Sequence, residues 1–159
     1  MMDYSYNIRK AVESDAADIH KVLQESFVKY MRDAGISGTV DALEETEDDI
    51  RRDILSKEVF IAFIDGVPVG TIRVEILPDD SAYITRFGVI HSFQGSGIGK
   101  SLIGLVEKYL KSRNIKKAFL YTASKYSDLV RFYYGRGFYI ESVSSDRGYL
   151  RAKMVRDFA

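Results

Sequence analysis

The spacing of the apolar residues switches several times along the chain between a helical and an extended period. An apolar residue every three or four positions indicates an amphipathic helix, whereas continuous or alternating apolar runs indicate strands. Helices are predicted to begin at Ser14, Leu43, Gly97 and Ser127. Strands are predicted over residues 6–11, 59–64, 69–77, 83–90, 118–121, 138–143 and 148–155.

The order of these elements, β-α-α-β-β-β-α-β-α-β-β, predicts an α/β fold built on one mixed sheet. An Asp-Gly pair at positions 65–66, between two apolar runs, is typical of a tight hairpin turn. In the next strand Thr71, Arg73 and Glu75 alternate with apolar residues, which predicts one polar and one buried face. The length of 159 residues, without an internal repeat or a flexible linker, indicates one domain over residues 1–159.

The composition narrows the classes of function. Lys plus Arg and Asp plus Glu each number 23, so no net charge attracts the chain to nucleic acid or to anionic lipid. The chain has no cysteine, which excludes disulfides, thiolate metal sites and a cysteine nucleophile. Residues 1–10 lack the apolar core of a signal peptide, and the apolar run 59–64 is too short to span a bilayer. We therefore expect a cytoplasmic protein with no nucleic-acid or membrane partner.

The segment 87–101, Phe-Gly-Val-Ile-His-Ser-Phe-Gln-Gly-Ser-Gly-Ile-Gly-Lys-Ser, carries the clearest chemical pattern in the chain. A predicted strand leads into three glycines at alternating positions, and an amphipathic helix follows directly. Glycine lets backbone N–H groups approach a ligand closely, and the first turn of a helix presents unpaired N–H donors at the positive end of its dipole. The pattern favours a phosphate or pyrophosphate site over a turn that binds nothing.

Two nucleotide-binding motifs fit this segment poorly. Gly99-Lys100-Ser101 matches the end of a P-loop, but Gln94 stands where the first glycine is required, and the strand at 118–121 ends without an aspartate for magnesium. The dinucleotide fingerprint lacks its last glycine and the acidic residue about twenty positions further on. A small nucleotide-phosphate enzyme is therefore the weaker alternative.

The same segment resembles the acyl-CoA signature of the GNAT superfamily of N-acyltransferases: Gln or Arg, two residues, Gly, one residue, then Gly or Ala. Gln94, Gly97 and Gly99 match its fixed positions. Ile-Arg-Lys-Ala at 8–11 looks like the family's first strand, and Phe-Tyr-Tyr-Gly-Arg-Gly-Phe at 132–138 looks like its closing helix-to-strand motif. The similarity follows the family's order along essentially the whole chain, and it implies the single-domain acyl-CoA N-acyltransferase fold.

The resemblance implies acetyl-CoA as co-substrate and no metal. The pyrophosphate of the coenzyme would be held by backbone N–H groups of the glycine-rich turn, here those of Gln94, Gly95, Ser96, Gly97, Ile98, Gly99 and Lys100. The main chain of Phe87, Gly88 and Val89 would pair with the pantetheine arm, and an amide of Val89 would stabilise the developing oxyanion. The Lys100 side chain is either a phosphate partner or a solvated lysine.

Tyr133 matches the tyrosine that commonly protonates the departing CoA thiolate in this family. A phenol with an ordinary pKa near 10 is protonated at neutral pH and can donate its proton. The alternative is a core aromatic, since this helix contains several. Two positions depart from the family pattern: Tyr126 replaces an asparagine that often contacts the cofactor, and His91 replaces a proline. We interpret His91 as a solvated turn residue rather than a base.

The base that removes a proton from the attacking amine is marked less clearly. Glu75 is the strand carboxylate that we select, although an alternating strand also leaves such a residue simply exposed, and a water chain can replace a single base. An acidic run could attract a cationic substrate, but a solvated helix face is the favoured interpretation. This run comprises Glu44, Glu45, Glu47, Asp48 and Asp49.

The residues and the resemblance together predict an N-acetyltransferase that moves an acetyl group from acetyl-CoA by direct attack of a primary amine, on a small molecule or a peptide. The alternative on the same fold is a non-catalytic acyl-CoA-binding sensor. The closing strands could also pair between subunits, so a homodimer is a further expectation.

Overall fold

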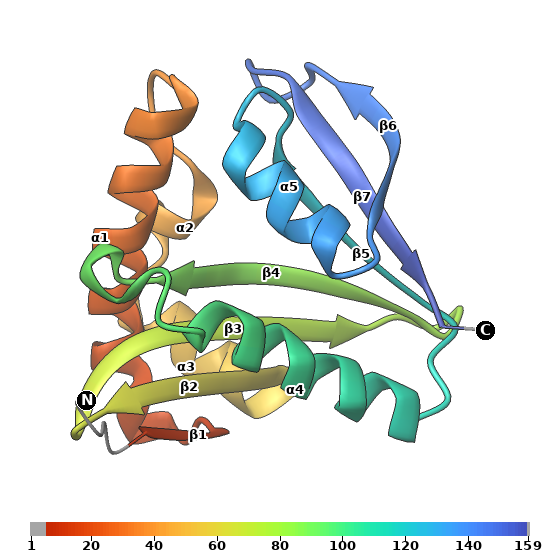
Figure 1. The fold of residues 1–159 in the computed structure, drawn as a ribbon. Helices are drawn as coiled ribbons and strands as arrows, with labels where there is room; N and C mark the ends of the chain where they lie inside the picture. Colours follow the sequence, from red (N-terminus) through yellow and green to blue (C-terminus); the bar gives the residue numbers. More distant parts are fainter. Residues whose placement is uncertain (1–5, 159) are drawn as a thin grey trace.

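A computed structural model describes residues 6–158 of the chain (Figure 1). The strands of these residues are β1 (Tyr6–Lys10), β2 (Glu58–Ile64), β3 (Val67–Ile76), β4 (Ser81–Val89), β5 (Lys117–Ala123), β6 (Tyr139–Ser144) and β7 (Arg151–Asp157). The helices are η1 (Glu13–Asp15), α1 (Ala16–Ala34), α2 (Asp41–Glu44), α3 (Glu47–Ser56), η2 (His91–Phe93), α4 (Ile98–Ser112) and α5 (Ser127–Gly135). Residues 1–5 and residue 159 lie outside the described part. Residues 1–5 belong to the segment 1–10, for which the sequence predicted no signal peptide.

The strands form one sheet with the order β1-β2-β3-β4-β5-β7-β6. The β4–β5 pair is parallel, and the other recorded pairs are antiparallel. The predicted α/β fold with a mixed sheet is therefore confirmed. The hairpin at 65–66 is confirmed as well, because Asp65 and Gly66 take φ values of 51° and 78°, as a tight turn between two strands requires.

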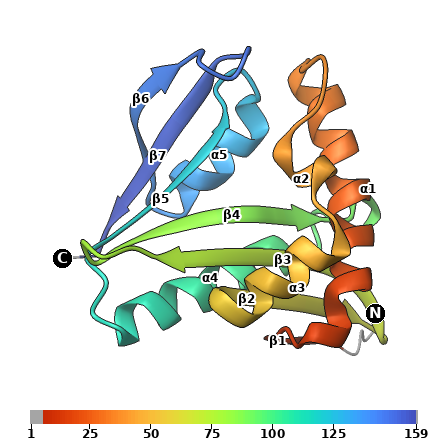
Figure 2. The ribbon, with the colours of Figure 1, turned by 180° about the vertical axis from the view of Figure 1, so that it is seen from behind.

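Helices cover both faces of the sheet (Figures 1 and 2). On one face α1 and α3 enclose a core in which Ile19, Ile50 and Ile61 are fully buried. On the other face α4 packs on β3 and β4, with Leu102 and Ile72 in a second core, and α5 lies on this same side against β5. Burial on both faces fixes β2, β3 and β4 as a rigid support.

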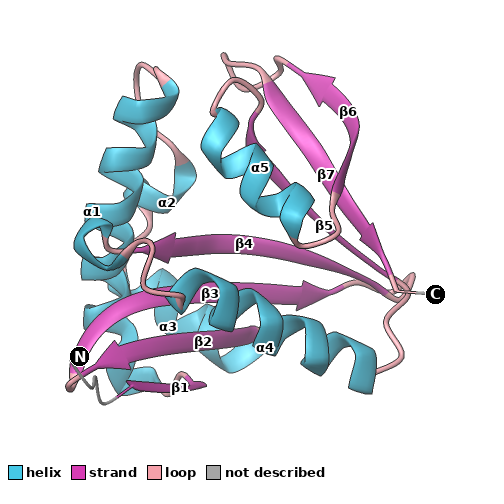
Figure 3. Cartoon of the chain, viewed as in Figure 1, coloured by secondary structure: helices cyan, strands magenta, loops and turns pink. Residues whose placement is uncertain are grey.

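The two central strands separate after a short paired stretch. β4 and β5 pair only over residues 81–83 and 117–119, after which β4 continues along β3 and β5 along β7 (Figure 3). The sheet therefore opens into two wings. Beyond Tyr83, the backbone groups of β4 that face β5 are left without a strand partner among the described residues. An open strand edge of this kind can hydrogen-bond an extended ligand.

The prediction of a helix that begins at Leu43 is wrong, because α2 ends at Glu44 and α3 begins as a separate helix at Glu47. Thr46 starts α3: its hydroxyl accepts a hydrogen bond from the Asp49 N–H at 3.1 Å, and the Asp49 carboxylate accepts one from the Thr46 N–H at 2.9 Å. This capping box starts a new helix, so the apolar spacing that suggested one helix belongs to two. Glu45, in the extended break, is thereby free to turn towards β3.

The predicted start of α1 also needs correction. Ser14 does not cap this helix but lies within the 3-10 turn η1, and Asp15 is the residue that precedes α1. The Asp15 carboxylate accepts a hydrogen bond from the Val12 N–H at 2.7 Å and two from the Arg9 guanidinium at 2.7 and 2.9 Å. These bonds lower the pKa of Asp15 below its ordinary value, chiefly through Arg9. The turn therefore holds β1 and α1 together.

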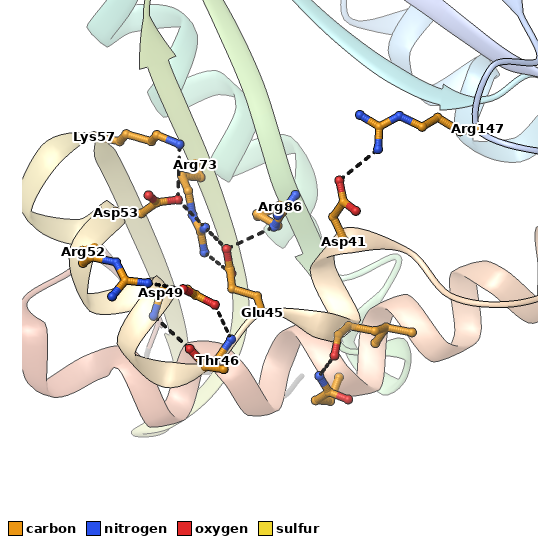
Figure 4. A network of polar contacts seen from close by, with 12 residues as sticks. Asp41, Glu45, Thr46, Asp49, Arg52, Asp53, Lys57, Arg73, Arg86 and Arg147 are labelled. Carbon is orange, nitrogen blue, oxygen red and sulfur yellow. Dashed lines mark hydrogen bonds and ion pairs between the residues drawn. The ribbon is translucent and has the colours of Figure 1, made fainter.

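The polar face predicted for residues 69–77 is not exposed to solvent. Thr71 and Arg73 are each only 1% exposed, because α1 and α3 cover this face of the sheet. The Arg73 guanidinium donates to both carboxylate oxygens of Glu45 at 2.7 and 3.0 Å and to Asp53 at 2.8 Å (Figure 4). A buried charge is costly unless it is paired, and these two carboxylates provide the pairing.

The last strand begins later than predicted, at Arg151 rather than at residue 148. Residues 145–150 consequently form a connection between β6 and β7, and Arg147 and Tyr149 project from it. Among the described residues, no helix combines the length and apolar character needed to cross a membrane. Nor does the described part bring together three His, Cys, Asp or Glu side chains that could hold a metal ion.

Candidate functional site

The separation of β4 and β5 opens a cavity of about 850 Å³ that is lined from both faces of the sheet. We call its two halves the α4 side, bounded by the glycine-rich turn, α4 and α5, and the α1 side, bounded by α1, residues 39–42 and the connection at 145–150. Most predicted site residues line it: Phe87, Gly88, Val89, Gln94, Gly95, Gly97, Gly99, Lys100 and Tyr133. The structure thus brings the glycine-rich turn and the candidate acid to one cavity.

The glycine-rich turn connects β4 to α4 through two residues that need glycine. Gly95 and Gly97 take φ values of 85° and 92°, a region in which a side chain is strained. The Gln94 side chain donates from Nε2 to the Val89 carbonyl at 3.1 Å and so ties the turn to the end of β4. Ile98 is 2% exposed and anchors the start of α4 in the core. The backbone between these anchors is held in place.

The start of α4 presents main-chain donors to the α4 side of the cavity. Ser101 is the residue whose N–H first closes a helical turn, with the Gly97 carbonyl at 3.0 Å. The N–H groups of Ile98, Gly99 and Lys100 precede it and have no acceptor four residues back within the helix. Three adjacent donors at the positive end of a helix dipole form a site for an anion such as a phosphate.

Two of the predicted donors are already engaged within the turn. The Gln94 N–H donates to the His91 carbonyl at 3.1 Å, and the Ser96 N–H donates to the Phe93 carbonyl at 3.2 Å. The Ser96 hydroxyl donates to the same Phe93 carbonyl. These bonds shape the turn, so in this conformation the N–H groups open to a ligand are concentrated at the first residues of α4.

Two other glycines allow close packing around the site. A Cβ on Gly88 would lie 2.3 Å from the Ser26 Oγ of α1, so only glycine lets α1 approach β4 this closely. A Cβ on Gly99 would instead lie 3.7 Å from the rings of Phe132 and Phe87, which is an ordinary contact. Alanine therefore fits at Gly99 without strain.

β4 contains one extra residue where it begins to separate from β5. Thr71 pairs with Gly88 and Arg73 with Thr85, so two steps along β3 correspond to three along β4. Arg86 lies in this widened stretch and takes a left-handed conformation, with φ of 51°. Such a bulge bends a strand and redirects the side chains beside it. Here it brings the Arg86 side chain to the cavity wall.

Tyr133 lies in α5 with its ring inside the molecule. It is 5% exposed, and its ring packs against those of Phe87 and Phe138 with centroids 6.3 and 5.8 Å apart. Gly137, at φ of 89°, reverses the chain after the helix, and the Phe138 N–H donates to the Tyr133 carbonyl at 3.0 Å. Burial raises the pKa of the Tyr133 phenol above its ordinary value, with a further rise from Tyr30.

Several candidates from the sequence lie outside the cavity lining. Ser96 and Ile98 contribute no lining side chain, and Ile98 faces the core. Glu75 is partly buried and pairs in register with Tyr83, in the stretch where β4 and β5 are still joined. His91 is exposed at the start of η2. The geometry therefore brings neither Glu75 nor His91 to the cavity wall.

The acidic run at 44–49 is largely engaged in ion pairs and also lies outside the lining. Glu45 is paired with the buried Arg73, and Asp48 with Arg51 at 2.5 Å. The interpretation as a solvated helix face describes the exposed members of the run, but it misses Glu45, whose side chain is 7% exposed.

Sequence reasoning missed a group of polar residues on the α1 side of the cavity. Arg86, Arg147 and Arg151 line it together with several tyrosines. Arg147 and Arg151 come from the connection before β7 and from the start of β7, on the wing that β5 and β7 form, whereas Arg86 comes from β4 on the other wing. The three arginines therefore line the cavity from both wings. No local pattern marks such a set in the sequence.

Tyr30 is a further residue whose role the helical spacing concealed. Its position in α1 fits an apolar stripe, yet its hydroxyl accepts a hydrogen bond from the Ala123 N–H at 2.9 Å and so joins α1 to the end of β5. Burial raises the pKa of Tyr30 to about 12. Its phenol is therefore neutral at physiological pH and spans the opening between the wings.

Comparison with known proteins places this geometry in context. Residues 18–138 match the model of the acetyltransferase (GNAT) family, whereas no curated protein matches the chain. The PaiA N-acetyltransferase of Thermoplasma acidophilum, solved in complex with coenzyme A, is similar at 24% identity and a TM-score of 0.82, over 97% of this chain and 99% of that one. A GNAT-family acetyltransferase of Staphylococcus aureus is similar at 20% identity and 0.78, over 98% and 100%.

Proposed function

Because the chain belongs to the GNAT acetyltransferase family, whose chemistry is acyl transfer, we propose that it transfers an acetyl group from acetyl-CoA to a primary amine by direct attack. The acceptor would be a small molecule or a peptide. The observation that carries the proposal is the set of free N–H groups at the start of α4, which opens on the same cavity as Tyr133.

The residues present fit coenzyme A. The N–H groups of Ile98, Gly99 and Lys100 would hold its pyrophosphate, with Gly95 and Gly97 shaping the turn. The open edge of β4 near Val89 would hydrogen-bond the extended pantetheine arm, and an amide there would stabilise negative charge on the carbonyl oxygen. When bound, the coenzyme supplies an acyl group activated as a thioester.

Tyr133 would act as the general acid. Its raised pKa keeps the proton on the hydroxyl at neutral pH, so Tyr133 can protonate the leaving thiolate as the acyl group departs. The aromatic rings around it exclude water from the donor. Among the lining carboxylates, Asp41 pairs with Arg147 and Asp128 lies at the exposed start of α5, so neither is assigned as base. Glu75 stays a prediction for that role.

Binding and turnover measurements test the proposal together. Calorimetry should show coenzyme A binding without magnesium, and an acetyl-CoA consumption assay over a panel of primary amines should identify acceptors. Magnesium-dependent ATP binding with weak CoA binding would favour the nucleotide-phosphate alternative. CoA binding with no acetyl transfer to any amine would instead support a non-catalytic acyl-CoA sensor.

The Tyr133→Phe variant tests the assignment of the acid. Removal of the hydroxyl should lower turnover at least about tenfold, as loss of a general acid typically does, with little change in CoA affinity. Tyr134→Phe is the matched control, because Tyr134 is the next residue of α5, is half exposed and does not line the cavity. Equal turnover in the two variants would remove Tyr133 from the mechanism.

A further inference from the structure

The three arginines of the α1 side line the cavity together with Tyr83. Burial raises the pKa of Tyr83, and the positive charges of Arg151, Arg86 and Arg147 each oppose that rise. The three positive charges therefore lie near enough to influence the same phenol. Of the charged side chains that line the whole cavity, five are basic and two are acidic. The α1 side carries most of this excess.

Arg151 has unused capacity to donate hydrogen bonds. Its side chain is 15% exposed and lies over the Tyr121 ring, with the guanidinium carbon 4.5 Å from the ring centroid. Its Nε is buried and has no hydrogen-bond partner among the described residues. The carboxylate paired with it, that of the exposed Asp146, lies 3.8 Å away, which is beyond hydrogen-bond distance. The site thus holds a partly buried guanidinium whose paired carboxylate lies beyond hydrogen-bond distance.

Arg86 belongs to a cluster with an excess of positive charge (Figure 4). Arg73 already donates to both oxygens of Glu45 and to Asp53, and Lys57 pairs with Asp53 at 3.3 Å. Arg86 comes no closer to Glu45 than 3.5 Å, and its buried Nε also lacks a hydrogen-bond partner in the described part of the chain. Three cations share two carboxylates, and Arg86 is the cation of the three that lines the cavity.

Arg147 contacts the opposite wall through an ion pair that can open. It pairs with Asp41 at 3.2 Å, and both side chains are more than half exposed. Figure 4 shows this pair reaching from the 145–150 connection to the start of α2. An exposed pair of this kind contributes little to stability, so an incoming anion can compete with Asp41 for the guanidinium.

We propose that the acceptor amine carries an oxyanion group, a carboxylate or a phosphate, which Arg86, Arg147 and Arg151 bind on the α1 side of the cavity. A planar guanidinium binds either group through two parallel hydrogen bonds. The inference rests on the proposed acetyl transfer, since it names the class of acceptor. It also predicts discrimination against diamines and polyamines, whose second positive charge would face the arginines.

Matched amine pairs test this class of acceptor with the wild-type protein. Lysine is compared with cadaverine, which lacks the carboxylate, and phosphoethanolamine with ethanolamine, which lacks the phosphate. We expect kcat/KM to be at least about tenfold higher for the anionic member of one pair, and that pair identifies the group. Equal or better acetylation of both cadaverine and ethanolamine, which lack the oxyanion group, overturns the inference but leaves acetyl transfer intact. CoA binding without transfer to any amine contradicts the proposed function and removes the inference with it.

Variants assign the preference to the arginines. Arg151→Gln and the exposed Arg147→Gln should each reduce the preference for the anionic member severalfold, with CoA affinity unchanged as evidence of folding. Lys153→Gln is the matched control: Lys153 lies on the same strand, stacks on Phe119 in place of Tyr121, pairs with Glu141 and does not line the cavity. A preference that survives in both arginine variants, or that falls equally in Lys153→Gln, contradicts the assignment.

Discussion

The two sides of the cavity use different parts of the chain for recognition. The α4 side offers main-chain N–H groups from one continuous segment, which are held by glycine conformations and by the buried Ile98. The α1 side offers side-chain charges from distant segments, with Arg86 close to an ion-pair cluster and Arg147 paired with Asp41. Backbone recognition suits an invariant diphosphate, whereas side chains can be exchanged without altering the fold. The proposed coenzyme site and the proposed acceptor site can therefore diverge independently.

The largest effect is expected from a change that breaks the support of the α1 side. Glu45→Ala leaves Arg73 buried with one of its two carboxylates missing, and loss of one partner of a buried pair costs about 3 kcal/mol of unfolding free energy. Urea denaturation measures this cost, with the neighbouring exposed Glu44→Ala as control. CoA affinity of the folded variant should stay unchanged. A loss of CoA binding in the folded variant would mean that the two sides are coupled.

A smaller effect is expected from a change confined to the α4 side. Gly97→Ala forces a side chain into the left-handed region, at a cost of about 1–2 kcal/mol, and should raise the dissociation constant of CoA about tenfold as the turn rearranges. Gly99→Ala is the control, since its methyl group meets Phe132 and Phe87 at ordinary distance. Calorimetry that finds the two variants equally weakened would contradict the assigned role of Gly97.

The smallest effect concerns the pH dependence of turnover. As the proposed general acid, Tyr133 would donate from its protonated form, and a raised pKa keeps that form populated to higher pH than for an ordinary phenol, whose pKa is about 10. The ratio of kcat between the wild type and Tyr133→Phe should therefore stay constant from about pH 7 to pH 10. A ratio that falls between pH 8 and 10 would show that Tyr133 ionises within this range and is less shielded than the structure indicates.

The same contrast explains what could be predicted from the sequence. Main-chain recognition leaves a local trace, because Gly95 and Gly97 take left-handed conformations and Gln94 ties the turn to β4. The strand and helix periods around the turn predicted the sheet. The α1 side leaves no such trace. Arg86 and Arg151 meet only through the sheet order, and residues that looked like a polar face, such as Arg73, were buried by α1 and α3.

The split between β4 and β5 has a consequence for the order of events in a catalytic cycle. Since the cavity is lined from both faces of the sheet, it offers separate walls to two ligands, and we expect both to be bound at the same time. A ternary complex is then the natural reacting species, and initial-rate plots at varied concentrations of both ligands should intersect rather than run parallel.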